Sequence, residues 1–242
     1  VRQWTLTPLC VSSNLTGAAN MYDNWHQPVF LEGDIMIDMH CHTNYSDGSN
    51  TPNEVLMLAE QKGIEYLAIT DHDTVEEYYN LDRSLFSGRI IPGIEMMTTY
   101  KGEVVEVLGL GIDVDKMREL LPKYYLSVKD KRLKEYDLIL AAYRKLGLTL
   151  DETKLVFDPD IDTCRGCFIH ELKRHEENLK YFLHPEFIEQ NIGFTRFEMF
   201  NPKSPFYVDE SSLYPKMEDV IAVIHECGGY AFLAHTYAYS SN

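Results

Sequence analysis

The chain has 242 residues, of which 45% are hydrophobic and 25% are charged, and its acidic residues outnumber its basic residues by 38 to 22. This length is sufficient for a sizeable hydrophobic core in one domain or two. A formal net charge of −16 argues against a broad basic surface, so we expect neither duplex DNA nor a membrane as a partner. The five cysteines form no even disulfide framework and no signal peptide is evident, which favours a cytoplasmic protein.

The beginning of the chain differs from the rest in composition. Residues 1–33 are rich in small and polar side chains and show no clear periodicity. We therefore expect residues 1–33 to be an N-terminal extension that is not part of the fold, followed by one domain over residues 34–242.

The first clear chemical signal is a short apolar strand that leads into two histidines separated by one residue. Side chains alternate between the two faces of a strand, so His40 and His42 should point the same way while Cys41 points away from them. The turn at Asp47-Gly48 can fold a carboxylate back towards the two imidazoles. Because imidazole is the commonest metal ligand, the pattern predicts a metal site, although two polar residues at a strand end would give the same pattern.

Two further apolar segments end in residue types that bind metals. Residues 66–70 lead into His72, which has an aspartate on either side, and residues 90–94 lead into Glu95. Three successive predicted strands therefore end in histidine or carboxylate side chains that can bind a metal.

Helices are predicted between these three strands. Residues 51–54 form a capping box with proline at the first helical position, and Gly63 ends that helix. Residues 74–77 repeat the capping signal before a second helix that should end near Gly88. Alternating strands and helices with short connections indicate a parallel βα array, in which the carboxyl ends of all strands lie on one side. The predicted ligands should therefore meet in one crevice.

Together these segments resemble the PHP (polymerase and histidinol phosphatase) domain family. Four motifs in order carry the resemblance, at residues 38–48, 69–74, 92–95 and 228–235. It implies an α/β fold, a distorted (β/α)7 TIM-like barrel that holds two or three divalent ions of manganese, iron or zinc. Position by position, the resemblance implies as metal ligands His40, His42, Asp47, His72, Glu95 and His235. Among them, Glu95 would bridge two ions.

The chain departs from the family's pattern in two places. Many members have a histidine just before an apolar-Leu-Gly run, where this chain has Glu106. Glu106 is either a further metal ligand, which would favour harder ions such as Mn²⁺, or an ordinary solvated strand residue. The family's final Asp-x-His motif is not found after Leu213. We therefore expect a barrel that lacks its C-terminal strands.

The motifs leave a long segment between them, and we expect residues 112–215 to form an insertion of helices and loops. Apolar residues recur near helical spacing over residues 115–147, which predicts one helix or two helices broken near Pro122. Another short helix is expected over residues 165–181. Insertions in this family commonly shape the substrate pocket, and the candidate phosphate contacts are Arg165, Arg196 and Lys203.

The resemblance implies a metal-dependent phosphoesterase that hydrolyses a phosphomonoester or phosphodiester. The acidic composition favours a small phosphorylated substrate, a nucleotide or the end of a short oligonucleotide. Bound metal ions would activate a water molecule, and His72 or His235 could protonate the leaving oxygen. The alternative is a non-catalytic metal-binding PHP module with a structural or partner-binding role. The missing Asp-x-His motif and Glu106 favour that alternative, whereas the six retained ligand positions oppose it.

Overall fold

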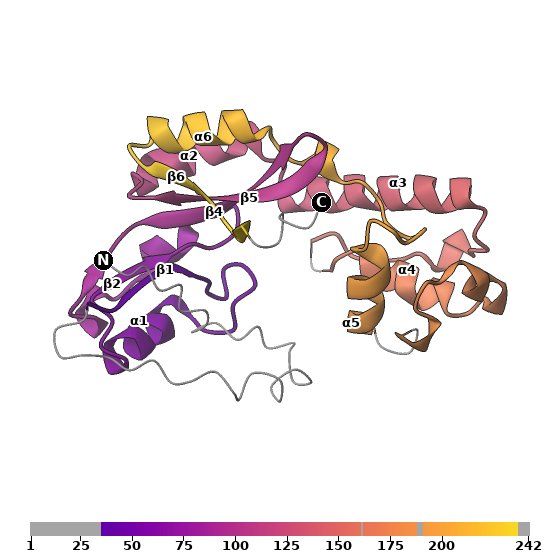
Figure 1. Ribbon diagram of the computed structural model, residues 1–242, viewed down its shortest axis with the longest axis horizontal. Helices are drawn as coiled ribbons and strands as arrows, with labels where there is room; N and C mark the ends of the chain where they lie inside the picture. The colour runs from indigo at the N-terminus through magenta and orange to yellow at the C-terminus, as the bar shows by residue number, and fades with distance from the viewer. Residues whose placement is uncertain (1–34, 161, 188–190, 237–242) are drawn as a thin grey trace. The chain divides into compact units, whose positions relative to one another are not determined.

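A computed structural model describes residues 35–160, 162–187 and 191–236 (Figure 1). The chain divides into two compact units. Unit 1 contains the described residues up to Tyr100, those of 104–125 and those from Pro215 onwards, and unit 2 contains 101–103 and 126–214. Each unit has its own buried apolar core. The expected extension over residues 1–33 lies outside the described residues.

The first sheet of unit 1 is parallel. Its order is β1 (Ile37–Cys41), β2 (Tyr66–Ile69) and the two-residue β3 (Arg89–Ile90). The helix α1 (Pro52–Gln61) connects β1 to β2 and begins with the predicted capping box. Parallel pairing places the carboxyl ends of these strands at one edge of the sheet.

The connection between β2 and β3 differs from the prediction of one helix. It contains two short 3₁₀ helices, η2 (Glu76–Asn80) and η3 (Arg83–Leu85). The chain leaves the helical conformation before Asp82, whose side chain accepts a hydrogen bond from the backbone N–H of Ser84. Such local bonds of aspartate compete with continued helix formation.

The second sheet of unit 1 has the order β4 (Gly93–Tyr100), β5 (Glu103–Leu110) and β6 (Tyr230–Leu233), and β6 pairs antiparallel to β5. A parallel bridge between His72 and Glu95 joins the end of β2 to β4. The described residues form two three-stranded sheets within a mixed α/β fold, in agreement with the expected fold class, and the (β/α)7 barrel without its C-terminal strands stays a prediction.

Two helices complete unit 1. α2 (Val114–Tyr124) lies beside α6 (Met217–Glu226), and α6 packs on the second sheet (Figure 1). Buried side chains from both helices, both sheets and α1 form a single core, which includes Leu56, Leu67, Ile94, Met117 and Ile224. This core fixes the strands whose ends carry the predicted ligands.

Unit 2 is built from helices. Its longer helices are α3 (Val128–Leu146) and α4 (Arg165–Leu172), followed by α5 (Asn191–Phe194) and the π-helical turn η7 (Thr195–Met199). The 3₁₀ helices of this unit are η4 (Glu152–Lys154), η5 (Glu176–Tyr181), η6 (Pro185–Phe187) and η8 (Ser211–Leu213). Among the described residues, no helix of either unit is both long enough and apolar enough to cross a membrane.

The core of unit 2 is aromatic. The ring of Tyr143 meets the rings of Phe168 and Phe206 edge to face, with centroid separations of 5.6 and 5.7 Å. All three side chains are fully buried, and edge-to-face contacts of this kind favour one packing arrangement over others.

The helical region predicted over residues 115–147 is divided into two helices near Pro122, in agreement with one of the two predicted alternatives. Pro122 lies in the last turn of α2, which ends at Tyr124. α3 begins after Ser127, whose side chain accepts a hydrogen bond from the backbone N–H of Asp130. Unit 2 covers most of the region expected as an insertion over residues 112–215.

Candidate metal centre

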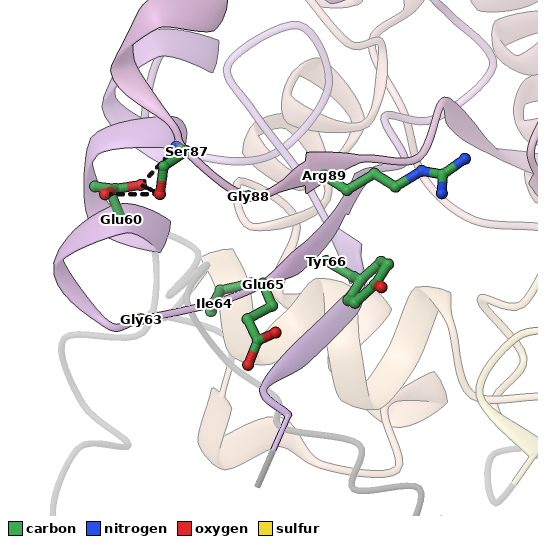
Figure 2. Close-up of a pocket in the computed structure, with 8 residues that line it drawn as sticks. All are labelled: Glu60, Gly63, Ile64, Glu65, Tyr66, Ser87, Gly88 and Arg89. Carbon is green, nitrogen blue, oxygen red and sulfur yellow. Dashed lines mark hydrogen bonds between the residues drawn. The ribbon is translucent and has the colours of Figure 1, made fainter. Parts of the chain in front are cut away.

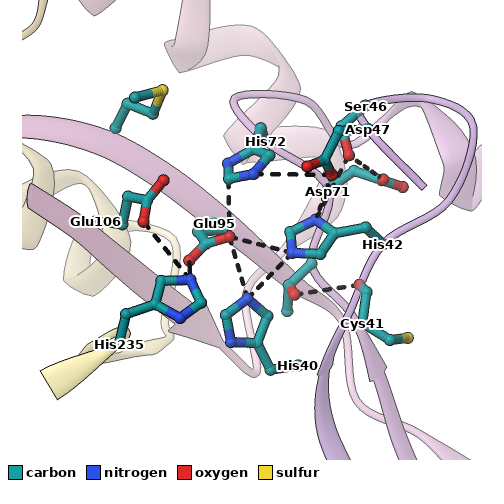
Figure 3. A network of polar contacts seen from close by, with 12 residues as sticks. His40, Cys41, His42, Ser46, Asp47, Asp71, His72, Glu95, Glu106 and His235 are labelled. Atoms are coloured by element: carbon teal, nitrogen blue, oxygen red, sulfur yellow. Dashed lines mark hydrogen bonds and ion pairs between the residues drawn. The ribbon is translucent and has the colours of Figure 1, made fainter. Parts of the chain in front are cut away.

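Four imidazoles surround the buried carboxylate of Glu95 (Figure 3). Its Oε2 atom lies 3.0 Å from Nε2 of His40, 3.2 Å from Nε2 of His42 and 3.5 Å from Nδ1 of His72. Its Oε1 atom lies 3.1 Å from Nε2 of His235. The Glu95 side chain is completely buried, while the imidazoles are 15% to 45% exposed. Five of the predicted ligands, from four separate segments, therefore converge on one point.

The two histidines of the first motif owe their position to strand geometry. Cys41 between them is buried, and its thiol donates a hydrogen bond to the carbonyl oxygen of Ala68. His40 and His42 project to the other side, with their Nε2 atoms 3.1 Å apart, as the alternation of side chains predicts.

Backbone pairing sets the position of His72 beside Glu95. The N–H of Glu95 donates to the carbonyl of Asp71 (3.2 Å), and the N–H of Asp73 donates to the carbonyl of Glu95 (2.9 Å). The two segments run parallel here, so the ends of β2 and the start of β4 present their ligands side by side.

His235 and Glu106 meet at the antiparallel pair of β5 and β6. The N–H of Ala234 donates to the carbonyl of Glu106 (2.9 Å), and Oε2 of Glu106 lies 3.5 Å from Nε2 of His235. Figure 3 shows the Glu106 side chain directed towards the cluster. His235 has φ = +47°, a left-handed backbone conformation that residues with a Cβ atom seldom adopt. The departure from the family's pattern thus places a carboxylate next to the imidazoles.

Asp47 lies at the rim of the cluster. Its Oδ1 atom is 3.7 Å from Nδ1 of His42 and 3.9 Å from Nε2 of His72, and its side chain is 67% exposed. The turn after the first motif therefore does fold a carboxylate back towards the imidazoles.

The electrostatics of the cluster favour a bound cation. Burial acts to raise the pKa of Glu95, but hydrogen bonds with His235, His40 and His42 outweigh it and hold that pKa well below its usual range. The hydrogen bond with Glu95 raises the pKa of His235. Burial lowers the pKa of His42, yet the contact with Glu95 and the nearby carboxylates raise it on balance. The cluster therefore keeps a buried negative charge and attracts positive charge.

The packing of the ligand atoms also fits a metal centre. Oε1 of Glu95 and Nδ1 of His72 are buried, and their polar contacts lie within the cluster, with Nε2 of His235 at 3.1 Å and Oε2 of Glu95 at 3.5 Å. Such atoms are costly to bury unless another group satisfies them. Two sets of three residues each place their ligand atoms within 4.8 Å of one another. The first set is His40, Glu95 and His235, the second is His42, His72 and Glu95, and the two sets share Glu95. Nitrogen and oxygen donors of this kind suit manganese, iron and zinc.

Sequence reasoning missed the polar residues behind the ligands. Asp71 is fully buried and accepts hydrogen bonds from Thr43 and Ser46. Asp38 accepts a hydrogen bond from the backbone N–H of His40 (3.2 Å), and burial raises the pKa of its carboxyl group. Both aspartates stand beside predicted ligands on apolar strands, and that position was the available signal.

The three predicted substrate contacts lie in unit 2. Arg165 is only 14% exposed, and its guanidinium pairs with Glu135 (2.7 Å) and Glu210. Two carboxylate partners argue against a further role for Arg165 in binding phosphate. Lys203 is exposed, and the side chain of Arg196 lies outside the part of the chain that the structure describes. Contacts of these residues with substrate remain predictions.

A separate pocket of about 610 Å³ opens at the amino ends of β2 and β3 (Figure 2). Its lining residues are Glu60, Gly63, Ile64, Glu65, Tyr66, Ser87, Gly88 and Arg89. The predicted ligands follow the carboxyl end of β2, so this pocket does not belong to the candidate metal centre.

Comparisons with known proteins agree with this geometry. The chain is 30% identical over 115 residues to the 5'-3' exoribonuclease Rnm of Escherichia coli, with 46% of this chain and 39% of that protein aligned. It is 27% identical over 204 residues to a 3',5'-nucleoside bisphosphate phosphatase of Chromobacterium violaceum, with 82% of this chain and 66% of that protein aligned. The chain thus spans less than two thirds of either relative.

A solved structure supports the fold. An amidohydrolase from Chromobacterium violaceum with bound sulfate and no metal matches with a TM-score of 0.56 and 24% identity, over 85% of this chain and 69% of that one. The family model of the PHP domain matches residues 38–182, more than half of the sequence. The protein therefore belongs to the PHP domain family.

Proposed function

We propose that this chain is a metal-dependent phosphoesterase that hydrolyses a nucleotide or the end of a short oligonucleotide. The observation that carries the proposal is the buried Glu95 carboxylate with four imidazoles within 3.5 Å of it. The names of the two relatives, an exoribonuclease and a nucleoside bisphosphate phosphatase, support nucleotide phosphates as the substrate class.

Two metal ions would be held by the two ligand sets that share Glu95. Asp47 and Glu106, at the rim, would offer further carboxylate oxygens. Divalent ions bound there would supply positive charge to the phosphoryl oxygens and would make a water molecule more acidic.

Residues of the chain would handle the proton and position the water. As the alternative to holding an ion, His235 could protonate the leaving oxygen, since it is the most exposed of the four imidazoles at 45% and the hydrogen bond with Glu95 raises its pKa. His72, which is 24% exposed, is the other candidate for this step. The exposed carboxylate of Asp47 can accept a hydrogen bond from the attacking water.

The charge of the protein favours short substrates. A net charge of −16 repels a long polyanion, so binding would depend on local attraction at the metal centre. A mononucleotide or a short oligonucleotide can bring its terminal phosphate to such a centre with few other phosphates close to the acidic protein.

The test compares hydrolysis with and without metal. The purified chain is stripped with a chelator, reloaded with Mn²⁺, Fe²⁺ or Zn²⁺, and given a nucleoside 3',5'-bisphosphate, a 5'-phosphorylated trinucleotide or histidinol phosphate. We expect release of phosphate from the bisphosphate, or of a mononucleotide from the trinucleotide, with metal only, and the loss of this release in Glu95→Gln.

Glu119→Gln is the matched control, because Glu119 is exposed and pairs only at the surface with Lys123 of the same helix. Hydrolysis that persists after complete removal of metal would refute the proposal. Bound metal without hydrolysis of any of these substrates would favour the non-catalytic module.

A further inference from the structure

Tyr45 is an exposed aromatic residue in the loop that carries two of the proposed ligands. It follows His42 by three positions and precedes Asp47 by two, and it is 39% exposed. Two residues of chain span about 7 Å at most, so the backbone of Tyr45 lies close to the rim of the candidate metal centre. Tyr45 belongs to neither of the two ligand sets, and the roles proposed above leave it without one.

Hydrogen bonds at both ends of Tyr45 hold it in one position. Its backbone N–H donates to Oγ1 of Thr43 (3.2 Å), and its hydroxyl group accepts a hydrogen bond from Nδ2 of Asn80 (2.6 Å). Thr43 is completely buried, and Asn80 is the last residue of η2, which follows His72 in the chain. The side chain of Tyr45 therefore reaches from the loop after His42 to the segment after His72.

The loop around Tyr45 is also closed on itself. The N–H groups of Ser46 and Gly48 donate to the carbonyl oxygen of Thr43, at 3.1 and 2.9 Å. A Cβ atom on Gly48 would lie 2.5 Å from the carbonyl oxygen of His42, so the turn leaves no room for a side chain there. An aromatic ring held by such a loop loses little conformational freedom when a ligand packs on it.

An exposed aromatic ring beside a phosphate site suits a nucleobase. One ribose separates the phosphate of a nucleotide from its base, so a phosphate at the metal centre leaves the base near the rim. Bases stack on aromatic side chains, and this contact tolerates every base because each base has a π-face. We propose that Tyr45 is a substrate-binding residue, whose ring stacks on the base of a nucleotide while the phosphate is held at the metal centre. The inference rests on the proposed function, and it adds that the base is bound whatever its identity.

The test measures binding without turnover. Its probes are the 5'-methylenephosphonate analogues of adenosine monophosphate, uridine monophosphate and ribose 5-phosphate, whose carbon–phosphorus bond is not hydrolysed. The ribose analogue carries the phosphonate but no base. Calorimetry of the protein loaded with Mn²⁺ gives the affinity for each probe, and the readout is the ratio of each nucleotide affinity to the ribose affinity. A change that only distorts the loop weakens all three probes and leaves this ratio unchanged.

Stacking of one base on an aromatic side chain is worth about 5- to 150-fold in affinity. We expect a ratio in this range for both nucleotide analogues in the wild type, and its loss in Tyr45→Ala and Tyr45→Leu. Tyr45→Phe keeps the ring without the bond to Asn80 and should retain most of the ratio. Tyr230→Ala is the matched control, because Tyr230 is 71% exposed at the first position of β6, whereas His235 follows the last position.

The outcomes separate this inference from the proposed function. A wild type that binds the three analogues equally, or binds none of them, would overturn the inference, and so would a ratio that persists in both Tyr45→Ala and Tyr45→Leu. Metal-dependent hydrolysis in such a wild type would leave the proposed function intact. A ratio that depends on Tyr45 in a protein that hydrolyses none of the substrates would defeat the proposed function alone.

Discussion

Both units bury charged side chains, but the partners that surround the buried charge differ. In unit 2, the guanidinium of Arg165 lies between Glu135 and Glu210 and over the ring of Phe200, 4.5 Å from its centroid. In unit 1, the carboxylate of Glu95 lies among four imidazoles of the described residues, each of which can be neutral.

The contrast distinguishes buried charges that are paired within the fold from buried charges that are available to bind a ligand. A buried cation held by carboxylates of the same chain is satisfied internally, although the net gain in stability is small. A buried carboxylate surrounded by the nitrogen atoms of four imidazoles offers a site for an added cation. The predictions below test this distinction.

The largest effect is expected in unit 2, from Arg165→Met. Removing one partner of a buried ion pair leaves the other charges unpaired, so the free energy of unfolding should fall by about 3–5 kcal/mol. Urea denaturation followed by circular dichroism measures the change. Arg144→Met is the control, since Arg144 makes an exposed pair with Glu152 and its loss should change stability little. An equally small effect of Arg165→Met would mean that the buried pairs contribute nothing to the fold.

In unit 1 the corresponding change is Glu95→Gln. It removes the shared ligand of both sets, so the affinity for Mn²⁺ or Zn²⁺ should fall by about 100-fold or more, since loss of groups that merely support a ligand already costs about 10- to 100-fold. The metal-free protein should stay folded, in contrast with Arg165→Met. Calorimetric titration and thermal unfolding of the same samples measure both quantities. Unaltered metal affinity would place the metal elsewhere.

Glu77 extends the comparison of the two units because it is a buried carboxyl group of unit 1 that lies outside the candidate metal centre. It is completely buried, and neither carboxylate oxygen has a hydrogen-bond partner among the described residues. Burial, helped by the charge of Asp71, raises the pKa of Glu77 from 4.5 to about 9. The folded state therefore holds this proton more tightly than the unfolded state does.

Between pH 4.5 and about 9, unfolding should release the proton of Glu77, so stability should fall as the pH rises through this window. The slope from this group approaches about 1.4 kcal/mol per pH unit. Glu77→Gln should remove that slope and be more stable than the wild type at pH 8, by about 1–3 kcal/mol once the cost of burying an amide is counted. Urea denaturation across the pH range measures it, and parallel curves for the two proteins would contradict the prediction.

The smallest effect is expected at Glu106. As a ligand at the rim, 3.5 Å from His235, it should add modestly to binding, so Glu106→Ala should weaken Mn²⁺ binding by about 10-fold. Glu106→His should keep the site and shift its preference from Mn²⁺ towards Zn²⁺, because nitrogen donors suit zinc better. Competition titrations with both ions measure the shift. Identical affinities in all three proteins would make Glu106 an ordinary strand residue.

The sequence predicts much of unit 1 because its signals are local. Strand alternation places His40 and His42 together, and the capping box at Thr51 marks the start of α1. The barrel that lacks its C-terminal strands is an expectation from family resemblance, and it stays a prediction.

Unit 2 could not be predicted to the same depth, because its contacts join distant parts of the chain. Arg165 looks like a free cation in the sequence, yet its partners Glu135 and Glu210 stand 30 and 45 residues away. No local pattern encodes that pairing. The hydrogen bond from Ser46 to Asp71 likewise joins residues 25 positions apart. The sequence indicates only that both are polar residues beside predicted ligands.

The left-handed backbone of His235 has a consequence for how metal loss would be felt. A left-handed conformation at φ = +47° costs a histidine about 1 kcal/mol or more. The contacts of the His235 imidazole with Glu95 and Glu106 can offset this cost. A metal held by His235 would lock this turn, and its release would let the backbone relax towards ordinary angles. Limited proteolysis after β6 would then proceed faster in metal-free protein, so the rate of cleavage would report occupancy of the centre.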